Sequence, residues 1–134
     1  VDERDLWPNG DFVSAQIIVR TEYLAAHPDI VHACIDAQVA VTQWMLADAA
    51  EAKQMVDAEI AKLSGKPLSA EVLDAAWGRM RPTWDPIAPS LVASADAAHA
   101  AGFLRVAPDL TAIYDLGNLN DVLRTRQLPE IQTH

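Results

Sequence analysis

The most distinctive hydrophobic pattern in this chain is an apolar run near its start that leads almost directly into a helix. Residues 12–19 read Phe-Val-Ser-Ala-Gln-Ile-Ile-Val and carry apolar side chains at both alternating sets of positions. A β-strand covered on both faces inside a sheet has this pattern. Apart from a short extended run at 103–106, the rest reads as helix or loop, and one or two strands do not form a stable sheet. We therefore predict a strand at 12–19 whose partner strands are missing from this chain.

The next element is a long helix that Pro28 opens, since proline favours the first helical position. Apolar residues recur with the helical period of about 3.6 residues as far as Ala47 and leave only a narrow polar stripe. We expect this helix to be mostly buried. Cys34 has apolar neighbours within it, so we expect Cys34 to pack as a small hydrophobic residue.

Further helices follow from capping signals. Asp48 and Gly65 bracket a surface helix at about 49–64. Ser69 caps a third helix, which ends before a proline. Asp85, followed by proline, opens a fourth that runs to about residue 101. Two short helices are expected at the end of the chain, at 109–116 and 118–124.

Composition indicates a globular body and excludes some partners. The 134 residues correspond to about one domain, so we expect a single unit over 1–134. No run approaches the roughly 18 apolar residues that cross a bilayer. The net charge is −9 and the ten Lys and Arg residues are scattered, so nucleic acid is not an expected partner. The chain opens at Val1 with no Met and no leader, so we expect it to be a mature product or a piece of a longer protein.

The residues that carry chemistry do not form a catalytic or metal-binding pattern. His27 and His32 lie five positions apart, where ligands on one helix face would be three or four apart. No nucleophile elbow and no phosphate-binding glycine motif is present. We therefore expect no enzyme activity, no metal and no cofactor.

Polar and aromatic residues in extended or loop positions are the candidates for ligand contact. Ser14 and Gln16 interrupt the apolar run, and a buried polar side chain needs a hydrogen-bond partner, either backbone or a polar ligand. Trp7 and Trp84 lie in loops, where a scaffold often presents ligand contacts, whereas the other two tryptophans lie at apolar helical positions typical of a core.

Taken together, several segments give the chain a resemblance to a known family. In order and spacing they resemble the C-terminal part of an ABC-transporter substrate-binding protein of the aliphatic sulfonate, nitrate and taurine group, over about residues 3–124. The segments are Asp5-Leu-Trp-Pro-Asn-Gly-Asp-Phe12, Ile17-Ile-Val-Arg-Thr-Glu-Tyr-Leu24, His27-Pro-Asp-Ile-Val31, Thr83-Trp-Asp-Pro86, Gly102-Phe-Leu104 and Asp109-Leu-Thr-Ala-Ile-Tyr-Asp-Leu116.

The resemblance implies a fold class: a mainly α chain with one N-terminal strand, the C-terminal fragment of a two-lobed α/β periplasmic-binding-protein-like (type II) fold. Residues 12–19 would be the strand that crosses the hinge, and residues 28–124 would be a helical layer over the first lobe. The implied function is the solute-binding component of an ABC importer, which closes around a small anion and delivers it to a membrane permease. The implied location is extracytoplasmic, either periplasmic or tethered by lipid.

In that family most ligand contacts come from the N-terminal half, so we expect this chain alone to be unable to bind solute. Ser14, Gln16, Thr83 and Trp84 are the candidate ligand-binding residues. Two alternatives stay open: a stand-alone helical interaction or dimerisation module, and a regulatory helical domain of an enzyme. An unpaired apolar strand invites pairing, so we also expect self-association through residues 12–19.

Overall fold

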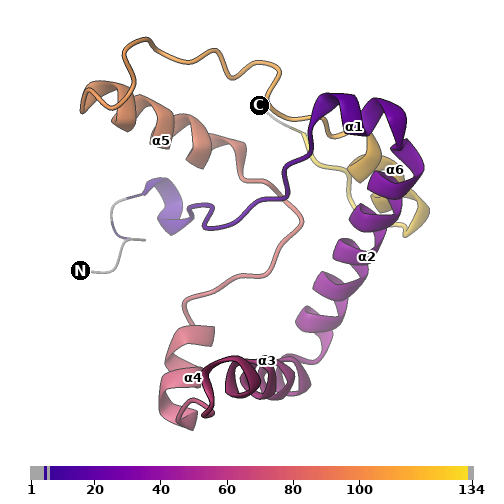
Figure 1. Cartoon of the computed structure of the whole chain (residues 1–134), viewed down its shortest axis with the longest axis vertical. Coiled ribbons are helices and arrows are strands. Elements are labelled where there is room, and N and C mark those ends of the chain that lie inside the picture. Colours follow the sequence, from indigo (N-terminus) through magenta and orange to yellow (C-terminus); the bar gives the residue numbers. More distant parts are fainter. Residues whose placement is uncertain (1–4, 6, 133–134) are drawn as a thin grey trace. The chain divides into compact units, whose positions relative to one another are not determined.

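The computed structural model describes residues 5 and 7–132, and that part is helical (Figure 1). The chain divides into two units, one formed by residues 1–35 and 85–134 and the other by residues 36–84. α2 contributes residues to both. The elements in chain order are the 3-10 turn η2 (Pro8–Gly10) and the helices α1 (Thr21–Ala26), α2 (Pro28–Ala47), α3 (Ala49–Ser64), α4 (Ala70–Trp77), α5 (Ala88–Ala100) and α6 (Gly117–Thr125).

The strand predicted at 12–19 is wrong, because no residue that the structure describes belongs to a strand. The segment runs without regular structure from η2 to α1, and its second half is exposed. The run at 103–106 forms bends. Without a strand in the described residues, the predicted two-lobed α/β fold is wrong as well. The physical reason is that a doubly apolar strand needs neighbours on both edges, and the described residues supply none.

α2 begins at Pro28 as predicted, but the expectation that it is mostly buried is wrong. Among its residues only Val39 and Thr42 are buried, and Cys34 is exposed. α2 also has the length and mean hydropathy of a membrane span, a property that signal sequences near an N-terminus and buried core helices share. The extracytoplasmic location therefore stays a prediction.

The second unit confirms the capping signals. The Asp48 carboxylate accepts a hydrogen bond from the Glu51 backbone N–H at 3.0 Å, and α3 ends at Gly65, whose φ of 84° is left-handed. Ser69 caps α4 in the same way. Its side-chain oxygen accepts a hydrogen bond from the backbone N–H of the residue three positions later in the chain. α3 and α4 pack together, and the Lys53 Nζ atom lies 2.6 Å from the Asp74 carboxylate between them.

The buried apolar residues described in the first unit lie in α6. Val122 and Leu123 are buried there. The Asn120 side-chain amide holds the following segment by two hydrogen bonds to the Ile131 backbone, its Nδ2 donating to the carbonyl oxygen (3.0 Å) and its Oδ1 accepting from the N–H (2.9 Å). The amide thus satisfies one backbone donor and one backbone acceptor, the same two groups that a neighbouring β-strand would otherwise pair.

α5 starts later than the sequence indicates. Its first residue is Ala88, and Pro89 takes the proline position in its first turn. Asp85 caps a tight turn in place of the helix, because its carboxylate accepts from the Ile87 backbone N–H at 2.8 Å. Ile87 has a φ of 49°, a left-handed conformation that interrupts the helix before α5.

The helix predicted at 109–116 is also wrong, because this segment forms turns. Asp109 accepts hydrogen bonds from the Thr111 backbone N–H (3.0 Å) and hydroxyl (2.7 Å). These bonds favour a turn over a helix, since the carboxylate satisfies a donor that a helix would use. They also hold the pKa of Asp109 below its ordinary value of 3.8, the backbone bond being the larger cause.

We expect Thr111→Val to raise the pKa of Asp109 only in part, because the backbone N–H still donates. The folded-state pKa is lowered, so this contact stabilises the fold at pH values above the ordinary pKa of Asp109, and the contribution is lost as pH falls through the folded-state pKa. NMR titration of the Asp109 carboxyl carbon measures the effect. Thr125→Val is the control, since Thr125 bonds to a different residue; an equal shift in both variants would contradict the assignment.

We expect Val122→Ala to lower the free energy of unfolding by about 2 kcal/mol, from the two lost methyl groups and the cavity they leave. Val122 is 1% exposed, whereas Val92 in α5 of the same unit is 46% exposed. Val92→Ala is therefore the matched control: both variants gain the same helix propensity, and only one loses burial. Urea unfolding followed by circular dichroism measures both. Equal losses would show that α6 is not the core of this unit.

Candidate functional site

The structure forms a pocket of about 310 Å³ within the first unit, between the segment that precedes α1 and the first turns of α5. Trp7 and Phe12 stack at one side of it, with ring centroids 5.8 Å apart and planes inclined by 21°. Both predicted polar interruptions, Ser14 and Gln16, line the pocket. The other described lining residues are Val13, Ala15, Ser90, Leu91 and Ser94.

Ser90 fixes the N-terminal segment to α5. Its hydroxyl oxygen accepts a hydrogen bond from the Val13 backbone N–H at 3.1 Å, although the two residues are 77 positions apart. Ser90 is buried, and the bond satisfies a backbone donor that no sheet provides for. The wall of the pocket that contains Ser14 is held in place through this bond.

Gln16 ties the same segment to two further parts of the unit. Its Nε2 atom donates to the Tyr114 hydroxyl at 2.9 Å and to the Pro86 carbonyl oxygen at 3.2 Å. Both N–H groups of the amide are therefore in use, and its Oε1 atom is the group left to accept a bond from a ligand. Gln16 is a positioning residue as much as a candidate contact.

The pocket offers hydroxyl groups and aromatic surface, and it carries no formal charge on its described lining. Ser14 and Ser94 are exposed and each supplies one O–H donor. A small molecule with an apolar part against the Trp7 and Phe12 rings and a polar group against the hydroxyls fits this chemistry. A fully charged anion would find few donors here.

Thr83 and Trp84, the other two predicted ligand residues, are the last residues of the second unit and are not among the lining residues of this pocket. Two residues that line the pocket, Ser90 and Ser94, had no distinctive sequence signal. Tyr114, which bonds to Gln16, lies in one of the segments that carry the resemblance, but nothing in the sequence singled it out. A serine in an Ala-rich helix does not reveal which distant backbone group it meets. Trp7, whose loop position was noted, is in the pocket.

The remaining titratable groups do not form a second site. Within the described ranges no three His, Cys, Asp or Glu side chains gather as metal ligands would. Arg124 has a raised pKa because it donates to Glu130 and to Asp121. It lies on the surface of α6 with Asp121 of the same helix, and its bonds to Glu130 hold the segment that follows α6.

Comparison with known proteins adds no relative: no family model, no curated protein and no solved structure matches this chain.

We expect Ser90→Ala to free the Val13 amide and speed its hydrogen exchange, because the buried acceptor is lost. The loss of such a bond costs about 1–3 kcal/mol, which predicts exchange faster by roughly one to two orders of magnitude at that amide. Ser94→Ala is the control, since Ser94 lines the same pocket one turn further along α5. Unchanged exchange at Val13 in the Ser90 variant would show that this bond does not hold the segment.

Proposed function

We propose that this chain belongs to the solute-binding component of an ABC importer for a small anion such as an aliphatic sulfonate, nitrate or taurine. The single structural observation that supports the proposal is the pocket that contains Ser14 and Gln16, two of the four residues predicted to contact ligand. The ordered set of segments at residues 3–124 supports it from the sequence. The two-lobed architecture is not part of the proposal.

The pocket contributes one wall of the proposed binding site. Its described lining has no cation, and the amide donors of Gln16 are already engaged by Tyr114 and Pro86. A buried anion needs several donors to replace its water shell, and two serine hydroxyls are too few. The remaining donors must then come from groups other than this described lining.

The proposal predicts a contrast between two titrations. The 134-residue chain should show no saturation by taurine, hexanesulfonate or nitrate below about 1 mM in isothermal calorimetry. The product of the complete reading frame that contains this sequence should bind one of the three. In that product Ser14→Ala or Gln16→Ala should weaken binding by about tenfold, the value of one hydrogen bond.

Gln54→Ala provides the matched control, since Gln54 is an exposed glutamine on α3 outside the pocket. A complete product that binds none of the three anions would overturn the proposed function. Binding by the complete product that is insensitive to both pocket variants would instead show that this pocket is not the site.

A second candidate function, a protein-association module, is favoured by a different observation. Ile17, Ile18 and Val19 are 65%, 91% and 42% exposed, in a segment of non-helical backbone. Three adjacent β-branched side chains in water are unfavourable, and covering them against another polypeptide removes that cost. Association would involve the same segment that lines the pocket, but through the exposed side chains of Ile17, Ile18 and Val19.

A further inference from the structure

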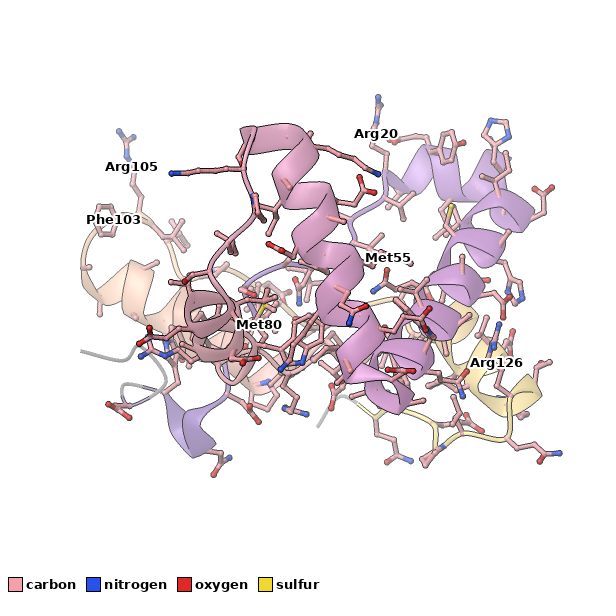
Figure 2. All side chains as sticks on the ribbon, turned by 90° about the horizontal axis from the view of Figure 1, so that it is seen from below. Arg20, Met55, Met80, Phe103, Arg105 and Arg126 are labelled. Atoms are coloured by element: carbon pink, nitrogen blue, oxygen red, sulfur yellow. The ribbon has the colours of Figure 1, made fainter. Side chains whose placement is uncertain are left out.

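The segment Ser14–Arg20 is exposed, and the backbone of its residues 14–19 is unpaired. Within the described chain, none of the backbone N–H and C=O groups of residues 14–19 makes a hydrogen bond. Regular pairing begins only at Arg20, whose carbonyl accepts the first bond of α1 and whose backbone is extended, with φ −69° and ψ 138°. Figure 2 shows the Arg20 side chain extending away from the ribbon. Such a segment is open to pairing with another strand.

The order of side chains defines two faces if this segment extends as a strand, because successive residues point to opposite sides. One face then carries Ala15, Ile17 and Val19, which are all apolar. The opposite face carries Ser14, Gln16, Ile18 and Arg20. The second face includes Ser14 and Gln16, whereas Ala15, the third residue of the segment that lines the pocket, lies on the first face. Strand pairing uses backbone groups along the edge, so the side-chain bonds of Gln16 to Tyr114 and Pro86 stay in place.

We propose that residues 14–20 pair antiparallel with the same residues of a second copy of this chain, across a two-fold axis at Ile17. This inference rests on the second candidate function and goes beyond the solute-binding proposal. Residues directly opposite in an antiparallel pair point to the same face, and a two-fold axis requires one residue to face its own copy. A central residue therefore fixes the whole register.

Ile17 is the central residue that pairs all of residues 14–20 with one another. In that register Ser14 faces Arg20, Ala15 faces Val19, and Gln16 faces Ile18. Centring on Gln16 would require Val13, whose N–H is already held by Ser90. Centring on Arg20 would place two like charges opposite each other, which is unfavourable.

The side chains match across the proposed axis. Ile17 meets its own copy, and the small Ala15 meets the β-branched Val19, giving one continuous apolar face. The Ser14 hydroxyl can accept a hydrogen bond from the Arg20 guanidinium. No acidic residue lies between Asp11 and Glu22. The chain has a net charge of −9, but in this stretch two copies can meet without placing carboxylates opposite each other.

The overall charge sets the strength and the salt dependence of the pair. Two copies that each carry −9 repel each other, and the repulsion is screened over about 8 Å at physiological ionic strength. A two-stranded ribbon is marginally stable in water, so the dimer should be weak. Added salt should therefore strengthen it, the reverse of the behaviour of an interface built on ion pairs.

Cysteine crosslinking tests directly which residues of the two copies lie opposite each other. The native thiol, Cys34, is exposed and is first replaced by serine. In that background Ile17→Cys places two thiols opposite each other, within the backbone separation that a disulfide spans, and diamide should link them. Ala15→Cys is the control on the same face: its two copies would lie about 13 Å apart, too far for a bond, so the Ile17 variant should crosslink at least about tenfold more.

A second measurement does not depend on cysteine. By sedimentation in the native sequence, Ile17→Lys should abolish the dimer, whereas Val106→Lys, at a position 77% exposed in the same unit, should not. Crosslinking that peaks at another position, or equally at both, contradicts the register. A strictly monomeric chain at high concentration and high salt contradicts self-pairing. Neither result bears on the solute titrations of the complete product, so the two proposals fail separately.

Discussion

Burial of apolar surface is the constraint on which this structure depends, and the described residues achieve little of it. Val39, Ala52, Val122 and Leu123 are the buried apolar residues of the two units together. Larger side chains, Phe103 among them, extend into solvent (Figure 2). Since hydrophobic burial is the dominant favourable term in folding, the hydrogen bonds that caps and side chains make carry an unusual share of the local order. The helices are locally well specified, and their packing is sparse.

The segment before α1 links the two functional readings. Its first half is held to α5 by Ser90 and forms a wall of the pocket, and Gln16 fixes its middle to Tyr114 and Pro86. Its second half exposes Ile17 and Ile18. A partner that pairs with the exposed half acts on a segment whose other half lines the pocket. Gln16 lies at the boundary between the two halves, and its two bonds hold the pocket wall whether or not the exposed half is covered.

The elements of this chain that could be predicted from its sequence are those whose structure is set locally. Asp48, Gly65 and Ser69 cap their helices as expected, because each cap depends on residues a few positions away. The prediction failed at 12–19, because an apolar pattern shows what a segment would bury and not whether a neighbour exists to bury it. In the pocket, Ser14 and Gln16 could be singled out as polar residues in an apolar run. Ser90 could not, since its partner lies 77 positions away and only the fold brings the two together.

The exposed path from Ser14 to Arg20 also bears on how long the protein survives in a cell. Proteases cut extended, unpaired backbone that fits their active-site clefts, and an exposed arginine followed by a helix start is a ready cleavage point. A copy whose segment is covered would be spared, and a copy left alone would be degraded. Abundance would then follow assembly, with surplus copies removed before their apolar side chains could drive aggregation.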